Sequence, residues 1–150
     1  MTLRESDTSD DRAEASIEHA ACLALLGDGG IGRVAVSIGA VPAVFPVNFA
    51  MLDGHVVFRT AEATGLPSAV RDAVVAFEAD DFDPLSQRGW SVLVVGAADE
   101  IADGARRARA EELLLRPPVP RSEEHMMAIF PELVSGQRVP GTPPGLDRTG

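Results

Sequence analysis

The segment from Arg59 to Thr64 carries the side chains best suited to binding an anion. Arg59 and Thr60 end an apolar run, and Thr64 precedes a predicted short helix with Pro67 in its first turn. Thr64 is therefore expected to be the N-cap of that helix, whose exposed N–H groups and dipole favour an anion. One guanidinium and two hydroxyls supply further donors, so the segment predicts a phosphate site. A capped helix beside an ordinary surface arginine explains the same residues equally well.

Two other motifs resemble known sites without the context that those sites need. Residues 27–32, from Gly27 to Gly32, match the G-x-G-x-x-G pattern of dinucleotide-binding folds, which requires a strand before the glycines and a helix after them. Here the predicted order is reversed, so the glycines are expected to end a helix and lead into a strand. The pentapeptide GWSVL at residues 89–93 begins like a nucleophile elbow, but Leu93 replaces the second glycine. A serine hydrolase is therefore not expected.

Candidate metal ligands are present but lack metal-binding spacing. An acidic cluster follows the fourth predicted strand: Glu78, Asp80, Asp81 and Asp83. Its oxygens could bind Ca²⁺ or Mg²⁺, but the EF-hand spacing is absent and such loops are usually solvated. The three histidines are far apart in the sequence: His19, His55 and His125. We therefore predict no metal site.

The composition restricts the chemistry further. The chain of 150 residues has a formal net charge of −10, and all 13 of its basic residues are arginine. Such an acidic chain is poorly suited to nucleic acid, which needs a clustered positive surface. Because lysine is absent, any phosphate must be bound by arginine, hydroxyl or backbone N–H groups. Cys22 is the one cysteine, and no apolar run approaches the ~18 residues of a membrane span. We expect a cytoplasmic protein that does not bind membranes.

The residues that could bind a ligand are carried by a predicted antiparallel sheet. Asp53-Gly54 joins two apolar runs, which is a strong hairpin signal. Strands are predicted at residues 34–38, 41–52, 55–60, 74–79, 90–95 with an extension to 101, 125–130 and 134–139. Helices are predicted at residues 13–26 with Ser16 as a cap and Gly27 at the end, at 64–68, and at 104–115 with Asp103 as a cap. This order predicts a mainly β domain, a closed or split antiparallel β-barrel of six to seven strands with two or three peripheral helices.

One domain is expected at this length. Residues 1–12 are predicted to form a disordered arm, residues 13–139 the folded domain and residues 140–150 a flexible tail. The run at residues 92–95 is apolar on both faces, and a single small barrel covers only one of them. A homodimer is therefore expected.

Five segments together resemble the pyridoxamine 5′-phosphate oxidase-like family. They are GRVAVS at 32–37, PVNF at 46–49, VFRT at 57–60, VVAFE at 74–78 and GWSVLVVG at 89–96. The resemblance extends from about Ile17 to Val139 in the family's order and spacing. It is nearest to the branch of nitroimidazole reductases and actinobacterial flavin- or deazaflavin-binding proteins. Members of the family are split β-barrels that form homodimers and bind FMN in grooves between the subunits.

The resemblance implies a set of site residues. The flavin ring is expected beside Pro46, Val47, Asn48 and Phe49, and the phosphate beside Arg59, Thr60, Thr64 and Gly65, with Ser91 on a neighbouring strand. The flavin itself accepts or donates hydride, so no catalytic side chain is assigned. The implied activity is that of an FMN-dependent oxidoreductase acting on a small molecule.

The sequence departs from the family's pattern at two places. Thr64-Gly65-Leu66 lacks the lysine of the usual Thr-Lys-Leu turn, and residues 44–50 lack the arginine and lysine that the oxidases use on the flavin phosphate. Loss of a charged contact costs about 1.5–3 kcal/mol, so true pyridoxamine phosphate oxidase activity is not expected. A deazaflavin-dependent reductase is a less favoured alternative, because its anionic cofactor prefers a basic groove and this chain is acidic. A cofactor-free binding module is a further alternative, which Gly65 favours because it replaces the lysine of the phosphate turn. A lysine at position 65 is expected to be tolerated, because a first-turn glycine has no obligatory positive φ.

Overall fold

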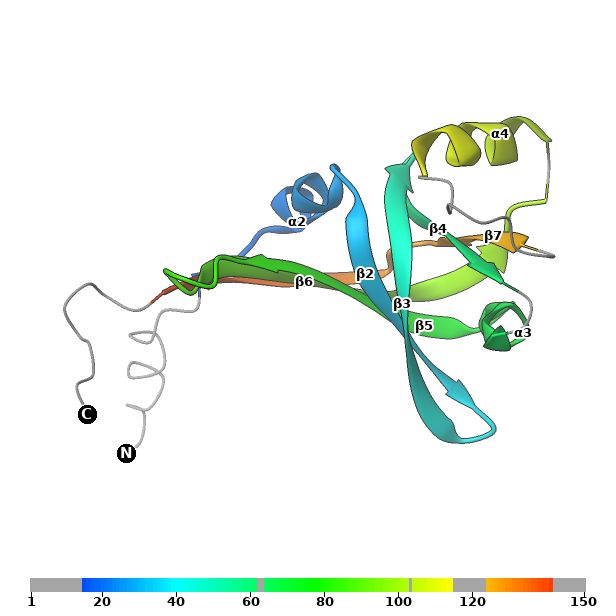
Figure 1. Ribbon diagram of the computed structural model, residues 1–150, viewed down its shortest axis with the longest axis horizontal. Coiled ribbons are helices and arrows are strands. Elements are labelled where there is room, and N and C mark those ends of the chain that lie inside the picture. The colour runs from blue at the N-terminus through cyan, green and yellow to red at the C-terminus, as the bar shows by residue number, and fades with distance from the viewer. Residues whose placement is uncertain (1–14, 62–63, 103, 115–123, 142–150) are drawn as a thin grey trace.

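The computed structural model describes residues 15–61, 64–102, 104–114 and 124–141. Within these ranges, eight strands form one antiparallel sheet that closes on itself (Figure 1). The strands are β1 (Ala15–Ser16), β2 (Gly30–Ile38), β3 (Val41–Leu52), β4 (His55–Ala61), β5 (Val74–Phe82), β6 (Arg88–Glu100), β7 (Glu124–Ile129) and β8 (Leu133–Pro140). The helices are α2 (His19–Leu26), α3 (Leu66–Val70) and α4 (Gly104–Leu113). The strand order is β1-β8-β6-β5-β2-β3-β4-β7, and a further pairing of β6 with β7 completes a ring.

The barrel is split because β6 changes partner along its length. Residues 88–95 of β6 pair with β8, and residues 98–100 pair with β7. The chain between β7 and β8 crosses beside Gly96, where the backbone N–H groups of Phe130 and Glu132 each donate a hydrogen bond of 2.9 Å to carbonyls on either side of that glycine. A Cβ at Gly96 would collide with the backbone of Phe130. The partner exchange therefore depends on glycine at this position.

Tight turns join β2 to β3 and β3 to β4, as the sequence predicts. Asp53 and Gly54 have φ angles of 52° and 79°, and a type I′ turn requires positive φ at both central residues. Gly39 and Ala40, with φ angles of 57° and 70°, connect β2 to β3 in the same way. Both hairpins follow the right-handed twist of the strands that they join.

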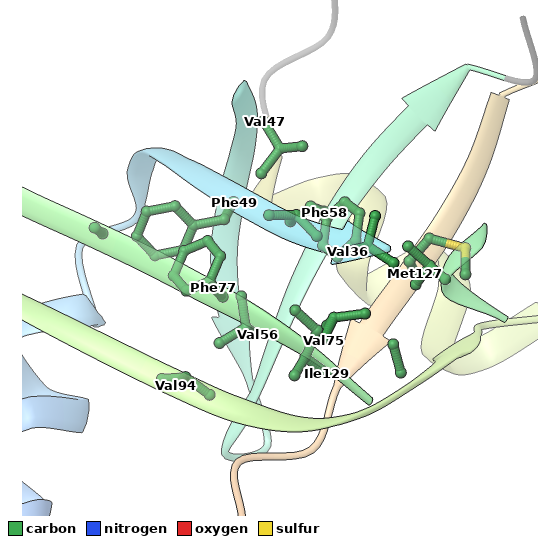
Figure 2. Packing of buried hydrophobic residues seen from close by; sticks show 14 of the residues in the cluster. Val36, Val47, Phe49, Val56, Phe58, Val75, Phe77, Val94, Met127 and Ile129 are labelled. Carbon is green, nitrogen blue, oxygen red and sulfur yellow. The ribbon is translucent and has the colours of Figure 1, made fainter. Parts of the chain in front are cut away.

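The core fills the ring with aromatic and branched side chains, as Figure 2 shows. Phe49 and Phe77 pack edge to face with their ring centroids 4.8 Å apart. Phe58, Val94 and Ile129 are fully buried beside them. Burial of such a side chain contributes about 1.5–3 kcal/mol, so this cluster is a main source of stability.

Three helices cover the sheet at different places. α2 buries Cys22 and Leu26 against β6 and β8. α3 buries Leu66 and Val70 against β2, β4 and β6. α4 packs Ala110 on the outside of β3, within a second apolar cluster that includes residues of β4 and β7. None of the helices in the described ranges has the length and apolarity needed to cross a bilayer.

The N-terminal helix is shorter than the sequence predicts. Ala15 and Ser16 belong to β1 and pair with β8, whereas residues 13 and 14 lie outside the described part of the chain. The N-cap of α2 is Glu18, without a side-chain hydrogen bond, so the prediction of Ser16 as a cap is wrong. The C-cap is Gly27, as predicted. Pairing with a strand at the opposite end of the chain has overridden the local apolar spacing and adds β1 to the six or seven strands expected.

The predicted mainly β split barrel is confirmed, with small differences in its elements. β5 extends to Phe82, beyond the predicted end at residue 79, so Asp80 and Asp81 lie on a strand rather than in a loop. β7 and β8 confirm the two predicted C-terminal strands. The predicted cap at Asp103 and the arm at residues 1–12 lie outside the described residues. The tail predicted at residues 140–150 lies outside them from residue 142 onwards, and Pro140 is the last residue of β8.

Candidate functional site

Residues 46–49 of β3 alternate between the inside and the outside of the barrel. Val47 and Phe49 are 7% and 5% exposed and point into the core. Pro46 and Asn48 are exposed on the outer surface. Because alternate residues of a strand face opposite sides, Val47 and Phe49 can offer only backbone groups to a ligand outside the barrel.

Part of one edge of β3 has no strand partner. β3 pairs with β2 through residues 41–49, but it pairs with β4 only from residue 49 onwards. β4 then diverges and pairs with β7 as far as Ala61. Among the described strands, none pairs with the β4 side of residues 41–48. Backbone groups along this edge are therefore available for hydrogen bonds to a ligand.

Arg59 and Thr60 point to opposite sides of β4. The Arg59 side chain is 12% exposed, and its Nε lies 3.4 Å from Oε1 of Glu124. Thr60 is buried on the side of Phe58, and its Oγ1 lies 3.4 Å from Oγ1 of Thr64. The structure therefore brings the two hydroxyls together and places the guanidinium on the other side of the strand. The three predicted anion-binding side chains do not form a single cluster.

The Thr64 hydroxyl organises the turn into α3. Its Oγ1 donates to the carbonyl oxygen of Ala61 at 2.7 Å and accepts from the backbone N–H of Leu66 at 3.1 Å. The N-cap of α3 is nevertheless Gly65, whose φ is 77°, so the predictions of Thr64 as the N-cap and of an ordinary φ at Gly65 are wrong. No atom lies within 4 Å of a Cβ built at Gly65. A side chain there has room but must adopt a disfavoured backbone conformation. The dipole of the five-residue α3 adds little, because few peptide units contribute to it.

Ser91 lies far from the other predicted site residues within one chain. It occupies β6, opposite Asp80 of β5 and Gln137 of β8. Its side chain faces the same outer side as Asn48, but β5 and β2 lie between β6 and β3. Three strand spacings of about 4.8 Å separate the two residues by roughly 14 Å.

The outer surface of β2, β3, β5 and β6 is largely exposed, and we call it the open face. The strand register places these side chains on it: Ile31, Arg33, Ala35, Val44, Pro46, Asn48, Val74, Ala76, Glu78, Asp80, Ser91, Leu93 and Val95. Its large apolar residues are strongly exposed, with values of 62% for Ile31, 63% for Val44 and 64% for Val74. The cluster around α4 covers the outside of β3 only from Ala50 onwards. Exposed apolar side chains at this density are typical of surfaces that contact a partner or a ligand.

Comparison with known proteins identifies the family. The family model described as pyridoxamine 5′-phosphate oxidase matches residues 18–138. The chain belongs to the pyridoxamine 5′-phosphate oxidase family. Uncharacterized protein Rv0080 of Mycobacterium tuberculosis is 42% identical over 113 residues, which cover 72% of this chain and 74% of the relative. The resemblance drawn from the five sequence segments is thereby confirmed.

Solved structures of two relatives have the same oxidase-family fold. A FAD binding protein from Mycobacterium smegmatis is 34% identical with a TM-score of 0.71, over 83% of this chain and 98% of the relative. A conserved protein of unknown function from Corynebacterium diphtheriae, DIP1874, is 31% identical with a TM-score of 0.69, over 83% of this chain and 97% of the relative.

A charged cluster on the open face of this oxidase-family barrel joins Glu78 and Asp80, two members of the acidic cluster predicted from the sequence, to Arg33, which the sequence does not connect with them. Arg33 Nη1 lies 2.9 Å from Glu78 Oε1 and 3.6 Å from Asp80 Oδ2. Burial is the main cause that raises the pKa of Glu78 to about 7; the neighbouring Asp80 carboxylate acts in the same direction and Arg33 opposes it. The i, i+2 spacing of the two acids is typical of residues on one face of a strand, but the sequence predicts that the strand ends at residue 79, between them.

A network of ion pairs that the sequence does not predict lies near Thr60, at one end of the barrel. His125 Nδ1 lies 2.7 Å from Glu100 Oε2, and Arg71 Nη2 lies 2.8 Å from Glu100 Oε1. The hydrogen bond from His125 is the main cause that lowers the pKa of Glu100, so this carboxylate is ionised at neutral pH. His125 is directly opposite Thr60 in the β4–β7 pair. No local sequence signal connects these residues, because they come from distant segments.

Two hollows in the surface flank Trp90 and lie largely apart from the site expected for this family. Their volumes are about 660 Å³ and about 350 Å³. Of the predicted site residues, only Phe49 lines either hollow. Across the described ranges, no group of three or more His, Cys, Asp or Glu side chains is placed to hold a metal ion.

Proposed function

We propose that this protein binds a flavin nucleotide beside residues 46–49 of β3 and acts as an oxidoreductase on a small molecule. The observation that carries the proposal is the 34% identity, across 83% of the chain, with a FAD binding protein. The unpaired edge of β3 supports it, because this edge borders the open face where Pro46 and Asn48 stand.

The edge of β3 suits a flat heteroaromatic ring. The edge presents backbone C=O acceptors and the N–H donors of residues other than Pro42 and Pro46, and a flavin ring carries both kinds of hydrogen-bonding atom. The exposed Val44 and Ile31 offer apolar surface on the adjoining open face. A bound flavin supplies the hydride or electron transfer. The chain's own residues hold and orient the ring and keep water from the side that they cover.

The residues expected to bind the flavin phosphate suit their ligand less well than the edge of β3 suits the ring. Arg59 has a carboxylate partner, Glu124, at 3.4 Å, so a phosphate must compete with that carboxylate. Thr64 is an exposed residue, but its hydroxyl already donates its proton to the carbonyl oxygen of Ala61, and Gly65 offers only its backbone. We therefore expect the phosphate to bind more weakly than in relatives with a Thr-Lys-Leu turn. FMN is the expected cofactor, with FAD and a deazaflavin as the alternatives. Residues 44–50 lack the basic side chains that the oxidases use, which argues against pyridoxamine phosphate oxidation.

We infer further that the site is completed in a homodimer. Ser91 lies roughly 14 Å from Asn48 within one chain, so it stands apart from a ring bound at β3. A second copy on the open face would bury exposed apolar residues and turn an open surface into a groove.

Fluorescence titration of the purified protein with FMN, FAD, riboflavin and a deazaflavin tests flavin binding. We expect FMN or FAD to bind, and Arg59→Ala to weaken that binding about tenfold or more while leaving riboflavin unchanged. Arg109→Ala is the matched control, because Arg109 also pairs with a carboxylate, Asp53 at 3.0 Å, but belongs to α4. Binding of none of these compounds would favour a cofactor-free module. An equal effect of both variants would place the phosphate away from Arg59.

A further inference from the structure

The charged cluster of Arg33, Glu78 and Asp80 lies among apolar residues of the open face. Arg33 is directly opposite Pro46 of β3, and Glu78 is directly opposite Leu93 of β6. The side chains of Arg33, Glu78 and Asp80 are only 46%, 33% and 30% exposed. One guanidinium is shared between two carboxylates, so the fully ionised cluster carries one excess negative charge.

A second copy of this chain is the partner that matches the open face. The face carries both signs of charge between apolar side chains, so it can complement itself across a twofold axis. The β2–β3 hairpin projects beyond the ring in Figure 1, and Val41 and Val44 near its tip are 62% and 63% exposed. A hairpin that projects from one copy can lie along the exposed strands of the other.

We propose that a second copy packs on the open face and that this association takes up protons at the Arg33–Glu78–Asp80 cluster. The proposal rests on the homodimer of the proposed function and adds its control by pH.

The direction of the effect follows from the excess charge. Two ionised copies would bring two excess negative charges together and remove water from them, which is unfavourable. A proton on each Glu78 leaves a neutral Arg33–Asp80 pair and a carboxyl group that can donate a hydrogen bond. The charged groups that face Glu78 are Arg33 from β2 and Asp80 from its own strand, whereas β6 places Leu93 and Ser91 there.

Burial raises the pKa of Glu78 to about 7 in the single chain. A second copy that covers the open face buries Glu78 further and so raises this pKa again. The pKa of Glu78 is therefore higher in the dimer than in the free chain. The dimer binds more protons than two free chains at pH values above about 7, so lowering the pH through this range strengthens association. Below that range the free chain already holds the proton, and the effect levels off.

Sedimentation velocity of the purified full chain, at a series of concentrations and at pH values from about 6 to 9, tests the proposal. Uptake of one proton per chain limits the change in the dimer dissociation constant to about 100-fold per pH unit, and we expect at least about tenfold tightening from pH 8.5 to 7. Glu78→Gln should give a tight dimer with a flat pH profile, because it resembles the protonated side chain. Glu112→Gln is the matched control: it removes one exposed carboxylate from α4 and should retain the wild-type slope.

The outcomes separate the two proposals. A wild-type dimer whose dissociation constant does not change with pH, or a Glu78→Gln slope equal to that of wild type, would overturn proton uptake and leave the homodimer standing. A monomer at every pH and concentration would overturn both, while flavin titration of the same samples still tests the cofactor. If Glu78→Gln does not fold, Asp80→Asn provides the test. It removes the excess charge, so it should tighten the dimer at pH 8.5, and a weaker dimer there would contradict the proposal.

Discussion

Gly65 occupies the position at which the usual turn of this family carries a lysine, and its φ of 77° means that the backbone differs as well as the charge. We expect Gly65→Lys to tighten FMN about tenfold, because an ammonium group adds a charge-assisted contact to the phosphate. The same variant should lose about 1–2 kcal/mol of unfolding free energy, because lysine must adopt the left-handed conformation. Denaturant unfolding and fluorescence titration measure the two effects.

Gly65→Asn is the control for this substitution. Asparagine adopts the left-handed region more readily and brings no charge, so it should cost less stability and leave the FMN affinity unchanged. Riboflavin should bind both variants like the wild type. If the lysine and asparagine variants are both folded and bind FMN equally well, the phosphate does not lie at this turn.

Glu124 provides a second residue-scale prediction through its ion pair with Arg59. Glu124→Gln removes the carboxylate that competes with a phosphate for the guanidinium, so FMN should bind about three- to tenfold more tightly. Glu111→Gln is a suitable control because it also removes a carboxylate 3.3 Å from an arginine, Arg107, but within α4. Riboflavin affinity should change in neither variant. Weaker FMN binding by Glu124→Gln would mean that this pair orients Arg59 instead of competing for it.

At the scale of elements, Gly96 determines whether β6 can exchange one partner strand for another. A Cβ at this position collides with the backbone of Phe130, which crosses from β7 to β8. We expect Gly96→Ala to lower the unfolding free energy by more than about 2 kcal/mol, because two backbone segments must move apart. Gly104→Ala, where no atom lies within 4 Å of an added Cβ, should leave stability unchanged or raise it by up to about 1 kcal/mol. Equal urea midpoints for the two variants would show that the crossing adjusts without cost.

The elements also show what local sequence patterns can and cannot predict. The Asp53-Gly54 turn and the apolar runs beside it predict their hairpin correctly, because the φ preferences act between near neighbours. The local apolar spacing predicts a helix at Ala15 and Ser16, and this prediction fails because their partners in β8 are remote in sequence. The site shows the same limit. Alternation within β4 is sufficient to separate Arg59 from Thr60, but the carboxylate beside Arg59 comes from β7 and has no local signal.

At the scale of the whole molecule, association must overcome the repulsion between two chains that each carry a net charge of −10. Salt screens such repulsion beyond a Debye length of about 8 Å at physiological ionic strength. The apolar side chains of the open face carry no charge, so salt does not screen the free energy that they gain when a second copy buries them. The favourable part of dimer formation is therefore expected to come from apolar burial, and the electrostatic part to set its dependence on pH and salt.

Val44→Arg tests this division between apolar burial and net charge. Val44 is 63% exposed on the open face, and arginine there makes each chain less acidic while placing a charge where a second copy should pack. If apolar burial drives association, the dimer should weaken at least about tenfold, because burying the valine side chain alone contributes about 1.5–3 kcal/mol. Leu113→Arg makes the same change in net charge at a residue of α4 that is 51% exposed, and it should leave the dimer intact. Light scattering distinguishes the 15.8 kDa chain from a particle of twice that mass. Equally tight dimers in the two variants would place the interface elsewhere than on the open face.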